Sequence, residues 1–113
     1  MEPRIGHLEV FVQDPVASRD WYVHVLGAKF VADQGLAQWV ALGVVEILLR
    51  PGSGSVAGAY RATSVAPVLY LSDLDGFRER LESNGVAVTH GDDDECLTFQ
   101  DPDGHWYQAT AHP

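Results

Sequence analysis

The sequence has a single cysteine, Cys96, among its 113 residues. One cysteine cannot form an intrachain disulfide or a cysteine-rich zinc site, so both are excluded. No apolar run reaches the roughly 18 residues that a membrane-spanning helix needs. The first residues, Met1-Glu2-Pro3-Arg4, also lack the basic segment and apolar stretch of a secretory signal. We therefore expect a cytoplasmic protein with no membrane partner.

Positive charge is scarce as well. Lys and Arg number 7 against 16 Asp and Glu, which gives a formal net charge of −9. Affinity for nucleic-acid phosphates comes largely from Lys and Arg, so nucleic acid is not an expected partner. Part of the negative charge lies in the run Asp92-Asp93-Asp94-Glu95. We interpret it as a solvated loop, because four consecutive side chains cannot all converge on one cation.

What the sequence does contain is an ordinary globular composition, with 46% hydrophobic and 20% charged residues. The first half begins with an alternating pattern that is typical of a strand over residues 5–12. Asp14-Pro15 then provides a helix N-cap followed by proline at the first helical position, and the helix is expected to end at Gly27. The apolar positions expected on its buried side are Val16, Tyr22, Val25 and Leu26. Three short apolar runs predict strands over residues 29–33, 37–42 and 44–50.

The pattern then starts again after a segment rich in Gly and Ser, Pro51 to Ala59, which predicts a flexible connector. A strand is expected over residues 67–71, and Asp73 can cap a helix that ends at Asn84-Gly85. The apolar stripe of this helix is Leu74, Phe77 and Leu81. The remaining expected elements are strands over residues 86–89, 96–100 and 105–110, with turns at Gly91-Asp92 and at residues 101–104.

Both halves therefore have the order βαβββ. We predict one α+β domain, residues 1–113, with module 1 at about residues 5–50, a connector at about 51–65 and module 2 at about 66–111. Because one helix covers only one face of a sheet, each module has a second face available. Two modules would form a cupped mixed sheet with the helices on its outer face.

The strand alternation predicts which side chains line the concave side of this cup. They are His7, Glu9, Phe11, Trp39, Glu46, Ala66, Val68, Tyr70, Trp106 and Gln108. The assignment depends on register, because a slip of one residue would turn every side chain of a strand to the other face.

Several short motifs occur along the chain in a characteristic order. They are His7-Leu8-Glu9-Val10-Phe11-Val12-Gln13-Asp14, Trp21-Tyr22, Leu26-Gly27, Val45-Glu46-Ile47-Leu48, Leu71-Ser72-Asp73-Leu74-Asp75, Asn84-Gly85 and Asp101-Pro102-Asp103-Gly104-His105. In order and spacing they resemble the vicinal oxygen chelate superfamily, which includes glyoxalases, bleomycin-resistance proteins and extradiol dioxygenases. The resemblance covers nearly the whole chain.

In the metal-dependent members, the resemblance implies up to four metal ligands, two from each module. They fall here on His7, Glu46, Ala66 and Gln108. Ala66 cannot coordinate a metal, and Gln108 offers a neutral amide oxygen where the family usually has glutamate. A catalytic divalent site needs three good protein ligands and an open position. We therefore expect no cofactor, with a divalent metal on His7, Glu46 and Gln108 as the alternative.

Other roles for single residues follow from their neighbours. His7 is expected to hydrogen-bond to Glu46 across the cup, and such a pair can also act as a proton acceptor. We interpret the other histidines as surface residues: His24, His90, His105 and His112. Cys96 follows acidic residues, which argues against a catalytic thiol.

The aromatic residues of the predicted concave face, Phe11, Trp39, Tyr70 and Trp106, favour stacking on a planar or aromatic ligand. Glu9 and Glu46 would favour a cationic group on that ligand. The preferred prediction is a protein that sequesters an aromatic or cationic natural product or antibiotic without chemistry, as the bleomycin-resistance branch does.

Two alternatives stay open beside this prediction. One is a metal-dependent lyase, isomerase or dioxygenase that uses His7, Glu46 and Gln108. The other is a vestigial cup whose domain acts only by protein association. In every case the open sheet edges of the two modules lead us to expect a homodimer.

Overall fold

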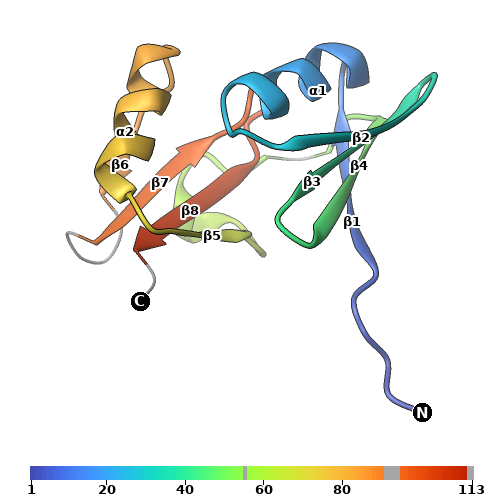
Figure 1. Ribbon diagram of the computed structural model, residues 1–113, viewed down its shortest axis with the longest axis horizontal. Helices are drawn as coiled ribbons and strands as arrows, with labels where there is room; N and C mark the ends of the chain where they lie inside the picture. Colours follow the sequence, from blue (N-terminus) through green and yellow to red (C-terminus); the bar gives the residue numbers. More distant parts are fainter. Residues whose placement is uncertain (55, 91–94, 112–113) are drawn as a thin grey trace. The chain divides into compact units, whose positions relative to one another are not determined.

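The computed structural model describes residues 1–54, 56–90 and 95–111 (Figure 1). The predicted turn at Gly91-Asp92, most of the acidic run and His112 lie outside these residues. The chain forms two compact units, residues 1–54 and 55–113, and each is described by itself. No helix in the described part of the chain is both long and apolar enough to pass through a bilayer.

The first unit contains one helix and four strands. They are β1 (His7–Val12), α1 (Pro15–His24), β2 (Lys29–Gln34), β3 (Ala37–Leu42) and β4 (Val45–Pro51). The sheet order is β1-β4-β3-β2, in which β1 runs parallel to β4 and the other neighbours are antiparallel. The strand order is mixed because α1 carries the chain across the sheet between β1 and β2, whereas two tight turns connect β2, β3 and β4.

Helix α1 begins as its sequence predicts. The Asp14 side chain accepts a hydrogen bond from the backbone N–H of Ala17 at 3.1 Å, and Pro15 follows in the first turn. Tyr22 is fully buried, but Val16 is 43% exposed, so its predicted place in the buried stripe is wrong. The buried positions within the helix are Pro15, Ser18 and Tyr22, whose spacing of three and four residues leaves Val16 on the solvent side.

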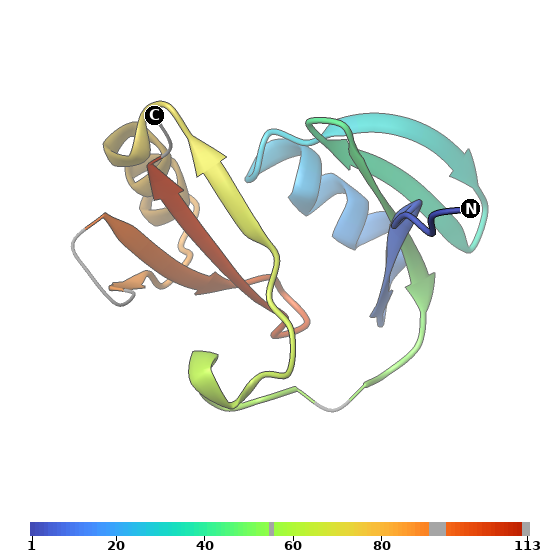
Figure 2. The same ribbon diagram turned by 90° about the horizontal axis from the view of Figure 1, so that it is seen from below.

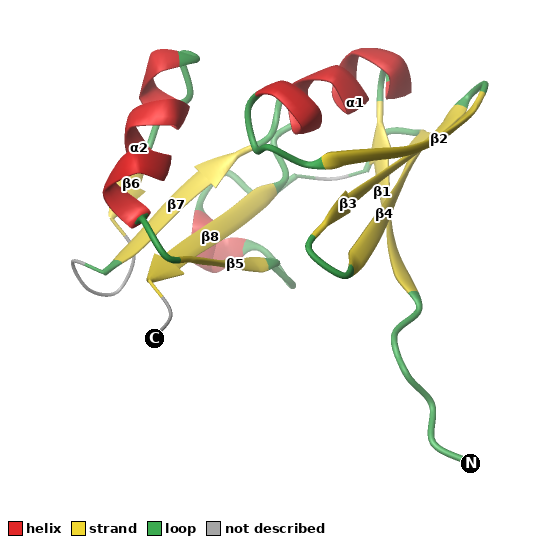
Figure 3. Cartoon of the chain, viewed as in Figure 1, coloured by secondary structure: helices red, strands yellow, loops and turns green. Residues whose placement is uncertain are grey.

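The second unit repeats this arrangement after a short additional helix. Its elements are the 3-10 helix η1 (Tyr60–Ala62), β5 (Val68–Leu71), α2 (Leu74–Ser83), β6 (Thr89–His90), β7 (Cys96–Gln100) and β8 (Trp106–Ala111). The sheet order is β5-β8-β7-β6, with β5 parallel to β8 (Figure 3). The predicted α+β fold of two βαβββ modules is therefore confirmed. The strand predicted over residues 86–89 lies instead at Thr89–His90, because pairing with β7 begins only at Thr89.

Each helix lies against one face of its own sheet (Figure 2). In the first unit that face carries Val12, Val40, Ile47 and Leu49, all at most 1% exposed. In the second unit it carries the stacked rings of Phe99 and Tyr107, whose centroids are 5.6 Å apart. Phe77 of α2 meets Phe99 edge to face, with ring centroids 5.9 Å apart. Neither α1 nor α2 covers the opposite face of its own sheet, and these two faces carry most of the residues that the alternation selected.

Candidate functional site

The open face of the first sheet brings together the predicted residues of that unit. His7 of β1 lies directly across from Glu46 of β4, and Trp39 of β3 lies across from Leu48. Residues two apart on a strand share a face, so His7, Glu9 and Phe11 lie on the same side as Glu46 and Trp39. Arg50, which pairs in register with Phe11, also belongs to this face and was not selected from the sequence.

The contacts on this face differ from those expected. His7 Nε2 lies 3.6 Å from Glu9 Oε2, and the His7 ring meets the edge of the Trp39 ring at 4.9 Å between centroids. The expected bond from His7 to Glu46 is therefore wrong: the neighbour two positions along the same strand takes that place. Glu9 is also paired with Arg50, whose Nη1 donates to Oε1 at 2.9 Å. The two carboxylates of this face are thus partly offset by a cation.

The open face of the second sheet carries Trp106 and Gln108 of β8. Thr98 and Gln100 of β7 lie beside them, since Thr98 pairs with Gln108 and Gln100 with Trp106. On the other side of β8, Val68 pairs directly with Gln108. Val68 has no ligating atom and neither does Ala66, which precedes β5. Whichever of Ala66 and Val68 occupies the third ligand position of the family, its side chain cannot coordinate a metal.

Trp106 is positioned by the turn that precedes β8. The Asp101 side chain, which is buried, accepts hydrogen bonds from the backbone N–H groups of Asp103 at 3.0 Å and His105 at 2.8 Å. Gly104 has a φ of 92°, a conformation that L side chains rarely adopt. The Asp-Pro-Asp-Gly-His motif thus forms a turn that the Asp101 side chain stabilises, and Trp106 follows it as the first residue of β8.

The connector folds onto this face and is held there by two hydrogen bonds. The Trp106 indole N–H donates to the carbonyl oxygen of Ala57 at 2.8 Å. The Tyr60 hydroxyl donates to Gln108 Oε1 at 3.0 Å. The Tyr60 and Trp106 rings meet edge to face, with centroids 6.0 Å apart and an angle of 75°. Part of the segment predicted to be a flexible linker therefore packs against the open face of the second sheet. This part is called the wall of the pocket below.

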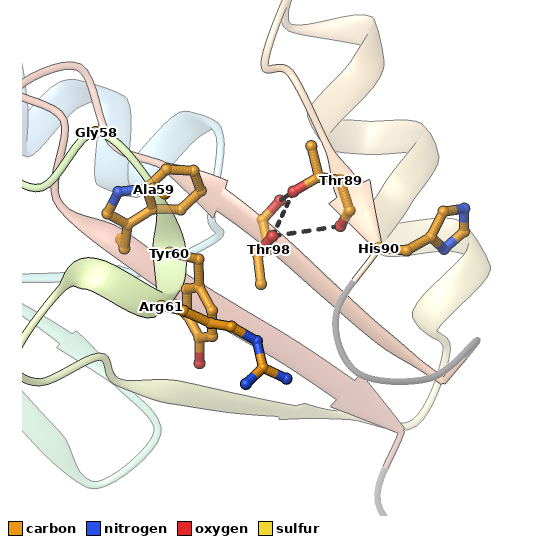
Figure 4. A pocket seen from close by; sticks show the side chains of 8 residues that line it. Gly58, Ala59, Tyr60, Arg61, Thr89, His90 and Thr98 are labelled. Atoms are coloured by element: carbon orange, nitrogen blue, oxygen red, sulfur yellow. Dashed lines mark hydrogen bonds between the residues drawn. The ribbon is translucent and has the colours of Figure 1, made fainter.

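A pocket of about 390 Å³ opens between this wall and the sheet. Its lining residues come from the connector and from three strands: Gly58, Ala59, Tyr60, Arg61, Thr89, His90, Thr98 and Trp106. Figure 4 shows Tyr60 and Arg61 extending from the 3-10 turn, and Thr89 and Thr98 on neighbouring strands with their hydrogen bonds to each other. The Thr89 and Thr98 hydroxyls are hydrogen-bonded to each other. The volume lies within the range of about 300–1,000 Å³ that small-molecule sites occupy.

Of the residues selected from the sequence, only Trp106 lines this pocket, and Gln108 supports its wall through Tyr60. Phe11 and Tyr70 are 45% and 66% exposed on their open faces and do not line it. Tyr60, Arg61, Thr89 and Thr98 were missed. An aromatic residue beside an arginine directly after the Gly- and Ser-rich segment was the available signal for the first two.

The described residues offer an incomplete set of the ligands that the family would use for a divalent ion. The amide oxygen of Gln108 already accepts a hydrogen bond from Tyr60, and the neighbouring position on β5 is Val68. Across residues 1–54, 56–90 and 95–111, no group of three or more His, Cys, Asp and Glu side chains could hold a metal ion. A histidine and a carboxylate on one sheet fall short of the three ligands that a catalytic site requires.

Comparison with known proteins places the fold. The sequence matches the Glyoxalase/Bleomycin resistance protein/Dioxygenase superfamily over residues 4–109. The chain belongs to this superfamily. The resemblance expected from the motifs is therefore confirmed, and the superfamily's two-module fold agrees with the two sheets described above. No curated protein matches the sequence at a significant level.

Several solved structures share this fold. The fosfomycin resistance protein FosX from Listeria monocytogenes is 16% identical with a TM-score of 0.82, covering 100% of this chain and 96% of its own. TioX from Micromonospora sp. ML1 is 23% identical with a TM-score of 0.73, covering 95% and 98%. TnmS3, an antibiotic binding protein from Streptomyces sp. CB03234, is 24% identical with a TM-score of 0.73, covering 99% and 98%. At these identities the likeness shows the fold alone.

Proposed function

We propose that this protein binds a small aromatic molecule, a natural product or antibiotic, and sequesters it without metal chemistry. The observation that carries the proposal is the aromatic corner of Tyr60 and Trp106 on a pocket of about 390 Å³. Two rings held by hydrogen bonds at their polar ends present fixed apolar surface, which favours stacking on a planar ligand. TnmS3, described as an antibiotic binding protein, shares the fold and supports this direction.

The second support is the state of Gln108. In a metal-dependent member this position would be a ligand, whereas here its amide oxygen accepts a hydrogen bond that fixes Tyr60 against the pocket. Gln108, at a metal-ligand position of the family, thus holds the aromatic side chain of Tyr60 in place. We infer that the sequence of this chain favours binding at the expense of metal coordination.

A metal-dependent enzyme remains the second candidate function. FosX from Listeria monocytogenes, which shares the fold, has been crystallised with Mn(II) and sulfate, and a mutant of it with Mn(II) and 1S,2S-dihydroxypropylphosphonic acid. His7 and Glu46 occupy two of the corresponding positions and lie side by side in register. Metal analysis of protein purified without chelator separates the two candidates. Stoichiometric metal that is lost in His7→Ala would favour the enzyme.

The preference for a cationic ligand has less support than the preference for an aromatic one. It rested on Glu9 and Glu46, and Glu9 is paired with Arg50 at 2.9 Å. We therefore restrict the proposal to the aromatic character.

We also propose a homodimer, because sheet edges such as β2 and β6 have a partner strand on one side only. Light scattering coupled to gel filtration tests this assembly, and a monomer mass would refute it.

The binding proposal is tested by calorimetric titration with a panel of aromatic antibiotics in the presence of EDTA. We expect at least one compound to bind wild-type protein and to lose about tenfold or more in affinity with Trp106→Ala, because stacked aromatic contacts and their buried area are removed. Trp21→Phe is the matched control, since Trp21 lies on α1 and packs on Tyr22. Binding that needs metal, or that Trp106→Ala leaves unchanged, would count against the proposal.

A further inference from the structure

We propose that Asn84 is a site of spontaneous covalent modification, at which the side-chain amide is converted to aspartate or isoaspartate when the last turn of α2 opens. The co-reactant is water and the leaving group is ammonia. Asn84 is the only asparagine of the sequence, and Gly85 follows it directly. Glycine has no side chain to hinder the attack of its backbone nitrogen on the preceding side-chain amide. The inference concerns the end of α2 and does not depend on the proposed binding function.

The modification has two steps. In the first, the backbone nitrogen of Gly85 loses its proton and bonds to Cγ of Asn84, while the bond from Cγ to Nδ2 breaks and ammonia leaves with that proton. The product is a five-membered succinimide ring. In the second, water adds to one of the two ring carbonyl carbons, and the bond from that carbon to the ring nitrogen breaks. Opening at Cγ leaves aspartate, whereas opening at the backbone carbonyl carbon leaves isoaspartate, in which the chain continues through Cγ.

The attacking nitrogen is bonded within the end of the helix. The backbone N–H of Gly85 donates to the carbonyl oxygen of Glu82 at 3.0 Å, and the N–H of Val86 donates to that of Leu81 at 3.0 Å. Gly85 has a φ of 76°. Together these features form the Schellman motif, which ends many helices. The reaction therefore requires this motif to open.

The Asn84 side chain is also held in an unreactive position. Its Nδ2 donates to the carbonyl oxygen of Arg80 at 2.8 Å. The ψ of Asn84 is 14°, which turns the Gly85 nitrogen away from the Asn84 Cβ, whereas ring closure needs both on the same side of the Cα–C bond. Asn84 is nevertheless exposed, so water reaches it without further unfolding. Opening of the last turn is therefore enough for the reaction.

The products cannot restore this helix end. A carboxylate has no N–H to donate to the Arg80 carbonyl, and its charge would lie at the negative end of the helix dipole. Isoaspartate also adds a carbon atom to the backbone, which displaces Val86 from its bond to Leu81. Residues 86–88 lead directly to β6, which carries the pocket residue Thr89. The modification thus loosens the connection between α2 and a strand of the pocket, and it does so in one direction only.

Peptide mass mapping of the full chain, incubated at neutral pH, measures the conversion of Asn84 in folded protein and in urea above the unfolding transition. The two bonds of the motif, at about fivefold each in the opening equilibrium, predict conversion at least about tenfold slower in folded protein. The slowing should equal the protection of the Gly85 and Val86 amides against hydrogen exchange, because both processes need the same opening. Asn84→Gln, whose longer side chain would need a six-membered ring, is the control and should show no conversion.

The consequence for the helix end is tested with Asn84→Asp, which reproduces one of the two products. Exchange of the Gly85 and Val86 amides should become about fivefold faster than in wild-type protein, because the donor to the Arg80 carbonyl is lost. The amide of Ala62, which donates to Ala59 in the 3-10 turn, should keep its rate.

Three results would overturn the inference. Equal conversion in folded and urea-unfolded protein, or a slowing that does not match the amide protection, would refute control by the helix end. The absence of conversion at Asn84 in unfolded protein would refute the site itself. Unchanged exchange at Gly85 and Val86 in Asn84→Asp would refute the loosening.

Discussion

The attachment of the connector to the second sheet can be tested through one atom. Trp106→Phe keeps an aromatic ring at the first position of β8 but removes the indole N–H that donates to Ala57 at 2.8 Å. A neutral hydrogen bond contributes about 0.5–1.5 kcal/mol to stability. We therefore expect the free energy that holds the connector against the sheet to fall by about 1 kcal/mol, a change of about fivefold in the opening equilibrium.

Amide hydrogen exchange measures this opening directly. The backbone N–H groups of Ala62 and Thr63 donate to the carbonyl oxygens of Ala59 at 3.0 Å and Tyr60 at 3.1 Å, so they are protected only while the 3-10 turn is intact. In Trp106→Phe both amides should exchange about fivefold faster than in wild-type protein. The amide of Val86, bonded to Leu81 at the end of α2, should keep its rate.

The matched control deletes an equivalent bond in the first unit. Trp39→Phe removes an indole donor that bonds to Gln34 Oε1 at 3.0 Å, and it should leave exchange at Ala62 and Thr63 unchanged. Unchanged exchange at both amides in Trp106→Phe would refute the reasoning, because the turn would then be held by something other than the indole bond. Faster exchange at Val86 as well would mean that the whole unit had been destabilised.

Three further predictions concern the fold that carries the site. The side-chain hydrogen bond from Gln38, and then the backbone hydrogen bond from Gly35, lowers the pKa of Asp33. The folded state therefore gains its full stabilisation from ionised Asp33 above the ordinary carboxyl pKa and loses it as the pH falls through the lowered value. Carboxyl NMR titration should show that the pKa of Asp33 rises in Gln38→Leu. Gly104→Ala should lower the free energy of unfolding in urea by more than about 1 kcal/mol, because φ is 92° and the new Cβ would lie 2.8 Å from Val56 Cγ1. Gly35→Ala, whose new Cβ would have nothing within 4 Å, should lower it less. Asp73→Ala should lose about 1 kcal/mol and Asp73→Asn far less in thermal unfolding, because the side chain caps α2 by accepting from Gly76 N–H.

The sequence was sufficient for the features that depend on local chemistry. Asp14 and Asp73 both cap helices at the predicted positions, and Gly85 with its positive φ follows the end of α2 as predicted. Helix α1 ends earlier than predicted, at His24 rather than at Gly27. The period-two alternation also predicted the open face of each sheet, because a strand buried on one side must repeat its apolar residues at every second position. These rules act over a few residues and need no knowledge of the partner strand.

Several features that the sequence did not predict depend on contacts between distant segments. Composition marked the connector as flexible, and only the folded unit shows that Ala57 and Tyr60 bond to β8. The pairing of Gln108 with Val68 rather than with Ala66 follows from the register of two strands about 40 residues apart, which alternation alone leaves open. His7 pairs with Glu9 because both lie on one strand, two positions apart.

The central claim is that an aromatic molecule binds at Trp106 without metal. The most direct measurement is the indole N–H signal of each of the 3 tryptophans in a two-dimensional NMR spectrum, recorded while 2-naphthoate is added in the presence of EDTA. We expect the Trp106 signal to shift in a saturable way and the Trp21 signal to stay in place. A Trp106 signal that stays in place at saturating probe, or that shifts only when a divalent metal is supplied, would contradict it.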